Sequence, residues 1–183
     1  YIAALNTTAL ATLSTSSIAV LGVEQIQALT TSQIHALGTA QVAAFTQDQV
    51  AQLGSDQLLA LGTQGVAVLS VGQLEALTSD QVGVLSTAQI AALGADQVTG
   101  LRADQIASFG TAQVAALSSG QIAALELDDI ASLGSAQVIA LSTAQFSWLS
   151  TSQVATLNAE QLAAMDETMR RLGEGGEPPG LRA

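Results

Sequence analysis

The sequence predicts an all-α solenoid of very short helices, one in each eight-residue repeat, with a longer capping helix at its C-terminal end. Three observations predict this fold. From Leu5 to Leu172 the chain divides into 21 octads without an insertion or deletion. Each octad has two large apolar positions, and nearly every octad has a helix-start signal between them.

The first and sixth positions of the octad are the expected core. Position one is Leu in 18 octads, and position six is Ile, Val, Leu or Phe146 in every octad except the last, which has Arg170. Positions seven and eight are mostly Ala, which lets neighbouring backbones approach closely. An isolated helix of this length is unstable in water, so stacking of octads must stabilise the array. The exceptions at position one are Phe45, Phe109 and Met165.

The second and fifth positions predict the start of each helix. Position two is Ser, Thr, Asn, Asp or Gly in all octads but those with Arg102 and Glu126, and position five is Gln in 16 octads. A short side-chain oxygen followed three residues later by Gln is the capping box. The octads that show it best pair Thr30 with Gln33, Thr78 with Gln81, Ser86 with Gln89, and Ser142 with Gln145.

Glycine at position two also predicts the end of the preceding helix. Gly38, Gly54, Gly94 and Gly134 are expected to adopt the left-handed conformation that closes a helix. One octad then carries both a start and a stop. If two octads complete one coil, the array has about ten layers spaced roughly 8–10 Å apart.

Two other architectures fit the pattern less well. In one continuous helix, apolar residues spaced five then three apart would precess by about 80° per octad and form no seam. A β-solenoid needs apolar alternation, which positions two to five lack, and Ala and Gln after an N-cap favour a helix.

The octads divide the chain into four parts. Residues 1–4 form an incomplete octad, so the start resembles a cut from a longer array, and residues 5–157 form the solenoid. Residues 158–172 are expected to form the capping helix, with an apolar face and Arg170 and Arg171 in its last turn before Gly173 ends it. Residues 173–183 are expected to be a flexible tail. The predicted apolar face contains Leu162, Met165, Met169 and Leu172.

Composition and charge exclude several kinds of partner. The formal net charge is −11, with four basic residues, so the chain is expected to repel nucleic acid and anionic lipid. No apolar run approaches the roughly 20 residues of a membrane span, so no membrane insertion is expected. The chain has no Cys, which removes disulfides and thiolate metal sites.

Acidic residues recur at position four of the octad. A ladder of calcium sites is one interpretation, but a carboxylate in the first turn of a helix is favoured by the helix dipole alone. Asp128, Asp129 and nearby Glu126 are the densest cluster, and we expect a solvated edge there because no EF-hand loop surrounds them. The position-four acids are Glu24, Asp48, Asp56, Asp80, Asp96, Asp104, Asp128 and Glu160.

The remaining candidates for chemistry are few. His35 is the sole His, and no Ser, His and Asp constellation accompanies it, so a surface substitution is expected. One His with distant Met165 and Met169 predicts no haem ligation. Phe146 and Trp148 predict local repacking in preference to an aromatic binding platform. The sequence therefore predicts no enzyme, no catalytic residue, no metal site and no cofactor.

Hydroxyl residues at positions two and three are the most distinctive surface feature. In a regular coil they form ordered rows that suit ice, a glycan or a protein partner, although helix capping explains many of them. The Thr residues concerned include Thr31, Thr39, Thr63, Thr87, Thr111, Thr143 and Thr151.

Four octads carry a resemblance to a known repeat. The segments are LTTSQIHA, LGTAQVAA, LSTAQIAA and LSTAQFSW. With them, residues 5–164 resemble the "ALTTAQ"-type octapeptide arrays of very large bacterial surface or secreted proteins, often labelled as adhesins or haem-utilisation proteins. The resemblance implies a secreted or cell-surface location, flanking repeats or domains of a longer chain, and no shared reaction. Together with the repeat it predicts a structural spacer or display rod, with a binding module as the alternative.

Overall fold

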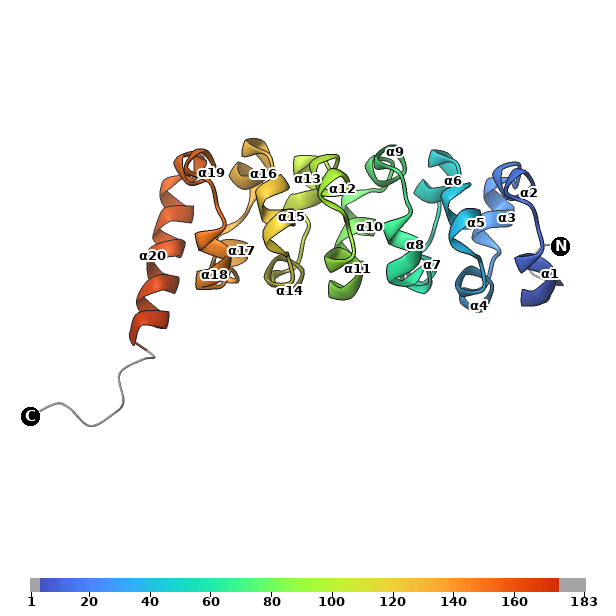
Figure 1. The fold of residues 1–183 in the computed structure, drawn as a ribbon, viewed down its shortest axis with the longest axis horizontal. Helices are drawn as coiled ribbons and strands as arrows, with labels where there is room; N and C mark the ends of the chain where they lie inside the picture. Colours follow the sequence, from blue (N-terminus) through green and yellow to red (C-terminus); the bar gives the residue numbers. More distant parts are fainter. Residues whose placement is uncertain (1–3, 175–183) are drawn as a thin grey trace, which may run out of the picture.

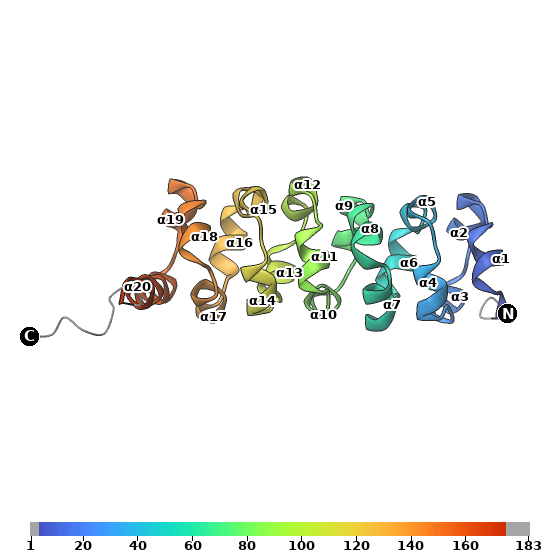
Figure 2. The same ribbon diagram turned by 60° about the horizontal axis from the view of Figure 1, so that its bottom comes forward.

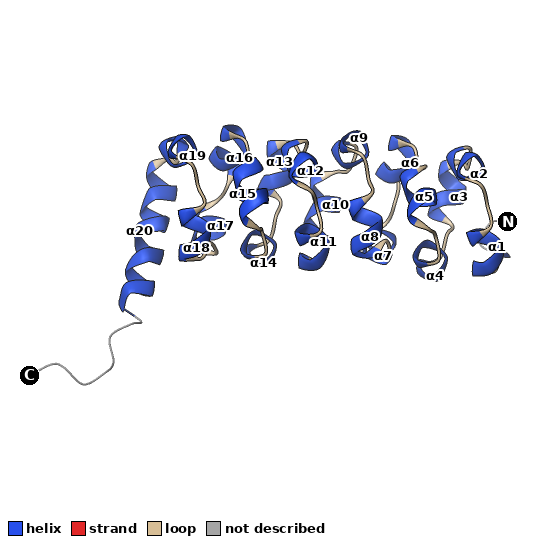
Figure 3. Cartoon of the chain, viewed as in Figure 1, coloured by secondary structure: helices blue, strands red, loops and turns tan. Residues whose placement is uncertain are grey.

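The protein is a rod of short helices wound into a solenoid (Figure 1, Figure 3). The computed structural model describes residues 4–174, and side chains for residues 4–170. This part of the chain contains no strand, which confirms the predicted all-α solenoid and excludes a β-solenoid and a continuous helix. The helices are α1 (Thr7–Ala11), α2 (Thr15–Ala19), α3 (Val23–Gln27), α4 (Thr31–His35), α5 (Thr39–Ala43), α6 (Gln47–Ala51), α7 (Ser55–Ala60), α8 (Gly62–Ala67), α9 (Val71–Glu75), α10 (Ser79–Gly83), α11 (Thr87–Ala91), α12 (Ala95–Thr99), α13 (Ala103–Ala107), α14 (Thr111–Ala115), α15 (Ser119–Ala124), α16 (Leu127–Ser132), α17 (Ser135–Ile139), α18 (Thr143–Ser147), α19 (Thr151–Thr156) and α20 (Ala159–Glu174).

Position two begins most helices as predicted. The hydroxyl of Thr30 accepts a hydrogen bond from the backbone N–H of Gln33 at 3.2 Å, and the Gln33 side chain accepts one from the N–H of Thr30 at 2.8 Å. These two bonds satisfy donors that the first turn of a helix leaves unpaired. The predicted boxes of Thr78, Ser86 and Ser142 are confirmed in the same way.

The end of the helix differs from the prediction. Gly38, Gly54, Gly94 and Gly134 have φ between −71° and −77° and are extended, so the left-handed stop is wrong for them. Helix α16 instead stops because position one, Leu133 (φ −64°, ψ 132°), leaves the helical conformation, and position two continues extended. Leu125 and Leu157 end α15 and α19 in the same way. This two-residue extended link redirects the chain without a left-handed residue.

Most helices pack against the helix three octads away, not two. The contacts run from α1 to α4, α2 to α5, α3 to α6 and onward to α17 with α20. Side chains of position five reach back 28 to 31 residues, which is more than three octads and fewer than four. One turn of the solenoid therefore takes between three and four octads, so two octads do not complete one coil. Figure 2 shows the turns stacked along the rod.

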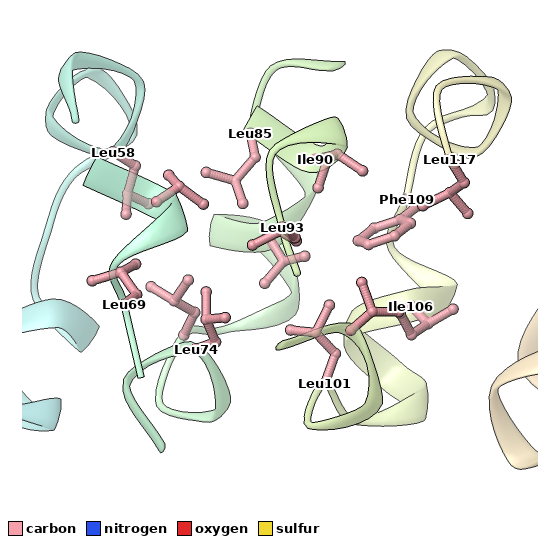
Figure 4. Close-up of a cluster of buried hydrophobic side chains, with 14 of the residues drawn as sticks. Leu58, Leu69, Leu74, Leu85, Ile90, Leu93, Leu101, Ile106, Phe109 and Leu117 are labelled. Atoms are coloured by element: carbon pink, nitrogen blue, oxygen red, sulfur yellow. The ribbon is translucent and has the colours of Figure 1, made fainter. Parts of the chain in front are cut away.

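A continuous apolar core runs along the inside of the rod. It consists of positions one and six, as predicted, and Figure 4 shows how such side chains from successive turns meet. Ile90 and Ile106 are 0% exposed, and Leu93 and Phe109 lie beside them at 4% and 3%. Position-six residues inside the rod lie between the turns before and after them, so the core stabilises a stack of turns and not a single octad.

The C-terminal helix caps the stack, but with a different face inward. Helix α20 packs against α17 and buries Gln161, Ala164 and Thr168, whereas Leu162 and Met169 are 39% and 44% exposed. The predicted apolar face is therefore wrong for Leu162 and Met169, whereas Met165 packs against the core as predicted. The orientation of α20 is set by Gln161, whose side chain donates to the carbonyls of Ile130 and Leu133 at 2.7 Å each and so must point inward.

The end of this helix lies beyond Gly173. Helix α20 continues to Glu174, so Gly173 is not its stop. Arg170 forms an ion pair with Glu167 at 2.7 Å. The side chains of Arg171 and Leu172, residues 1–3 of the incomplete octad and residues 175–183 of the predicted tail lie outside the described residues.

Candidate functional site

The position-five Gln links successive turns of the solenoid as well as capping its own helix. The side-chain oxygen of Gln105 accepts from the N–H of Arg102 at 2.9 Å. Its amide nitrogen donates to the carbonyls of Leu74 at 2.9 Å and Leu77 at 2.7 Å, one turn earlier. Gln105 is 0% exposed, so these three bonds satisfy polar groups that water does not reach.

The same link recurs along the rod, and we call this set of buried side-chain bonds the glutamine ladder. The usual acceptors are the position-one carbonyl 28 residues earlier and the position-six carbonyl 31 residues earlier. The sequence predicts the cap but carries no signal for this second role of the amide. The donors are Gln33, Gln41, Gln49, Gln57, Gln73, Gln81, Gln89, Gln97, Gln105, Gln113, Gln121, Gln137, Gln145, Gln153 and Gln161.

The ladder is interrupted where position five is not Gln. Ala9 and Ser17 lie in the first described turn, and Met169 lies in α20. The two interruptions inside the rod are Gly65 in α8 and Asp129 in α16. At Gly65 a changed backbone, and at Asp129 a carboxylate, take the place of the side-chain amide that links two turns.

At Gly65 the backbone itself changes. Helix α8 begins directly after α7, with Leu61 in the helical conformation (φ −59°, ψ −27°) where other octads are extended. Gly62 follows with φ +63°, the single positive φ within residues 4–174. A left-handed residue strongly favours Gly. The N–H of Gly65 then bonds to the carbonyl of Leu61 at 3.2 Å.

At Asp129 a carboxylate occupies the slot of the Gln amide. Asp129 is 3% exposed, so the predicted solvated edge is wrong for this residue, although Glu126 and Asp128 are exposed. Its Oδ2 accepts from the N–H of Glu126 at 2.8 Å. Burial raises the pKa of Asp129, and the charges of Glu126 and Asp128 add to this, while the bond from the Glu126 backbone opposes it.

Arg102 and Asp104 form a surface cluster with a polar partner from the preceding turn. Arg102 Nε lies 3.0 Å from Asp104 Oδ1, and Ser79 donates its hydroxyl proton to Asp104 Oδ2 at 2.6 Å. These hydrogen bonds, from Arg102 first and then Ser79, lower the pKa of Asp104 to about 2. Arg102 also donates to the carbonyls of Glu75 and Leu77. The cluster is a local tie between turns and is largely exposed.

Four of the eight position-four acids lie on one line of helices. Asp56, Asp80, Asp104 and Asp128 belong to α7, α10, α13 and α16, at intervals of three octads. Successive members of this line are three octads apart in the sequence, slightly less than one solenoid turn. Among the residues that the structure describes, no three His, Cys, Asp or Glu side chains form a group that could hold a metal ion.

A second line of helices carries no charge at all. The octads that begin at residues 13, 37, 61, 85, 109 and 133 contain no Asp, Glu, Lys, Arg or His. They hold α2, α5, α8, α11, α14 and α17, which contact one another in this order. We call them the neutral strip. In Figure 1 it descends from α2 at the upper edge to α11 and α14 at the lower edge, so it winds around the rod.

Threonine hydroxyls line the neutral strip. Five exposed Thr residues occupy position three of its octads, and Ser135 continues the line. Position three is the first helical residue in α2, α5, α11 and α14 and the second in α8, and not the N-cap, so capping leaves these hydroxyls unused. In the described chain they make no hydrogen bond to protein. The five are Thr15, Thr39, Thr63, Thr87 and Thr111.

The remaining predicted candidates lie apart from one another. His35 is exposed, as predicted, with its Nδ1 3.4 Å from the carbonyl oxygen of Ala60. Phe146 is 7% exposed and joins the core, whereas Trp148 ends α18 and is 39% exposed. The two aromatic side chains therefore do not form a shared platform.

Within residues 4–174, none of the helices is long and apolar enough to cross a bilayer.

The repeated caps, the inter-turn amides and the continuous core define a helical solenoid repeat protein. Comparison with known families gives the particular class. The ALTTAQ repeat matches residues 2–31, 26–55, 50–87, 83–111, 100–127, 122–159 and 130–167. The chain therefore belongs to the ALTTAQ repeat family. No curated protein is similar enough to be matched to it.

Proposed function

We propose that this chain is a non-enzymatic structural spacer, a rod that holds other parts of a longer bacterial surface or secreted protein apart. The observation that carries the proposal is the glutamine ladder. Each turn is joined to the next by buried amide bonds and by an uninterrupted core, so turns add along one axis without changing the cross-section.

Electrostatics also support a spacer. The titratable side chains in contact with one another, such as Arg102 with Asp104 and Arg170 with Glu167, form exposed ion pairs. The net charge of −11 keeps copies of an acidic rod apart. The location outside the cell rests on the kind of protein in which ALTTAQ arrays are found. Protease treatment of intact cells that express the parent protein tests it, because only a surface rod is cleaved.

The spacer proposal is tested by changing the number of octads. Duplicating residues 85–108 adds three octads and should lengthen the maximum dimension in small-angle X-ray scattering while the cross-sectional radius stays constant. The matched control inserts a Gly/Ser segment of the same length, which should add no rigid increment. A duplication that leaves the maximum dimension unchanged, or thickens the particle, would contradict the proposal.

A second candidate function is a binding module, and the neutral strip favours it. Free hydroxyls at one-turn intervals on an uncharged face suit a neutral, hydroxyl-rich ligand such as a glycan or ice. Replacing Thr39, Thr87 and Thr111 by Val removes three hydroxyls from the strip without touching a cap. The control replaces the three off-strip residues Thr31, Thr143 and Thr151 by Val.

The two sets of substitutions separate binding from folding. The strip variant should lose binding to neutral polysaccharide or inhibition of ice recrystallisation, with its helical circular dichroism unchanged. The off-strip variant should keep both. Equal loss in the two variants, or no activity in the unaltered chain, would remove this candidate.

A further inference from the structure

The position-five slot of a regular octad is built to hold a primary carboxamide. At Gln57 the amide oxygen accepts from the N–H of Gly54 at 2.9 Å, and the amide nitrogen donates to the carbonyls of Leu29 at 2.7 Å and Ile26 at 2.9 Å. The slot thus offers acceptors from the preceding turn to an NH₂ group.

Gly65 leaves the slot of its octad without a side chain. By the spacing of the ladder, the acceptors that a Gln at this position would reach are the carbonyls of Leu37 and Ile34. The Ile34 carbonyl already accepts from the N–H of Leu37 at 3.2 Å. Among the described residues, nothing donates to the Leu37 carbonyl.

A cavity of about 500 Å³ opens at this place, between α5 and α8 of the neutral strip. We call it the Gly65 notch. It has no Asp, Glu, Lys or Arg in its lining, so a charged ligand would lose hydration without gaining an ion partner. An apolar wall and a polar rim remain for a neutral ligand. The lining includes His35, Leu37, Val42, Leu61, Thr63 and Gly65.

We propose that the Gly65 notch binds a primary carboxamide from outside the chain. The ligand NH₂ donates to the Leu37 carbonyl, as the missing Gln would, and its aliphatic stem packs against Val42 and Leu61. This binding site is additional to the spacer role and does not depend on it. A free small amide and the side chain of a Gln or Asn on a partner both supply the required chemistry.

The unaltered chain provides the primary test. Titration of the ¹⁵N-labelled protein with propionamide should give saturable chemical-shift changes confined to residues 35–39 and 61–66. Propionate has the same stem and no NH₂ group, so it should give none. If propionate matches propionamide, or if neither saturates, the proposal is wrong.

A second ligand identifies the source of the carboxamide. N-acetyl-glutamine N-methylamide carries the amide on a peptide backbone. If it binds the notch at least as tightly as propionamide, a Gln side chain of a partner is the ligand. If propionamide alone binds, the notch accepts only a free small amide. Either result supports the carboxamide site.

A variant that fills the slot gives the matched test. Gly65→Gln should weaken propionamide binding at least tenfold, because the new side chain occupies the notch. A Cβ atom at Gly65 lies 3.0 Å from Leu61 Cβ, so Leu61 must shift slightly. The control is Gly120→Gln, whose Cβ meets nothing within 4 Å, and it should bind normally. A folded Gly65→Gln with unchanged binding overturns the proposal, and if this variant does not fold, the propionamide and propionate titrations decide.

Discussion

Helices α13 and α16 pack against each other and differ in the buried residue at position five, where one has Gln105 and the other Asp129. Both side chains are buried, at 0% and 3% exposure. Gln105 caps its helix and also donates to two carbonyls of the preceding turn. Within residues 4–170, Asp129 makes only the capping bond, in which its carboxylate accepts from the N–H of Glu126. The apolar core continues through both octads, whereas the inter-turn amide link is lost with the single change from Gln to Asp at position five.

The interrupted link has an electrostatic consequence as well. A buried carboxylate cannot donate to the carbonyls of Val98 and Leu101, which occupy the two acceptor positions in the preceding turn. Its charge is instead disfavoured, and the pKa of Asp129 is raised by burial. We therefore expect the octad of α16 to contribute less to the free energy of unfolding than the octad of α13.

Removing an intact link should have the largest effect. Gln105→Met keeps the length of the side chain but leaves two carbonyls and one N–H without their partner, so we expect a loss of about 3 kcal/mol in the free energy of unfolding, measured by urea denaturation. The control is Gln25→Met in the first described turn. Gln25 is exposed and accepts from Gly22, so its loss should stay below about 1 kcal/mol. Equal losses would contradict the ladder.

Repairing the interrupted link should stabilise the rod. Asp129→Gln restores a donor to the Val98 and Leu101 carbonyls and removes a buried charge, so the free energy of unfolding at pH 7 should rise by about 2 kcal/mol. Asp128→Asn removes a charge from the adjacent exposed residue and should change it by less than about 0.5 kcal/mol. A destabilised Asp129→Gln would show that the slot of α16 differs from the slot of α13.

The advantage of Asp129→Gln should depend on pH. Because the folded-state pKa of Asp129 lies above the ordinary 3.8, the folded protein binds this proton more readily than the unfolded chain. The destabilisation of the folded protein by the buried charge of Asp129 is therefore full at neutral pH, and it decreases as the pH falls through the raised pKa towards 3.8. Unfolding curves of both proteins between pH 7 and pH 4 should converge, and a gap that widens in acid would contradict the raised pKa.

A smaller gain is expected at the glycine caps. Gly94 has the same extended conformation as the capping Ser86, and a Cβ there lies 3.7 Å from the Gln97 side-chain oxygen, an ordinary contact. Gly94→Ser should raise the free energy of unfolding by about 1 kcal/mol through a new cap and a less flexible unfolded chain. Gly100→Ser is the opposite control, because its Cβ would overlap Val71. If Gly94→Ser destabilises, position two requires Gly for a reason other than its conformation.

The local structure was predictable because it depends on neighbouring residues. The capping box and the buried positions one and six are contained within one octad, and both are confirmed at Thr30, Gln33 and Ile34. The sequence of one octad does not determine the number of octads per turn, because every octad presents the same core residues to any neighbour. The recurrence of a charge-free octad at every third octad was the available signal, and it indicates a three-octad neighbour.

Two wrong predictions, the left-handed glycines and the inward face of α20, have the same origin. The extended conformation of Gly38 and its equivalents follows from how the chain must turn towards the next helix, which no single octad specifies. The inward face of α20 follows from Gln161 and its acceptors one turn earlier. Amphipathicity alone placed Leu162 and Met169 inside, because it takes no account of a buried polar side chain.

The most direct measurement of the ladder is scalar coupling across its hydrogen bonds. In a long-range HNCO experiment on the ¹³C,¹⁵N-labelled protein, the Nε2 of Gln105 should correlate with the carbonyl carbon of Leu77, 28 residues earlier. The other ladder Gln residues should show the same offset. Correlations with carbonyls only two octads earlier, or side-chain amides that exchange freely with water, would contradict the inter-turn link.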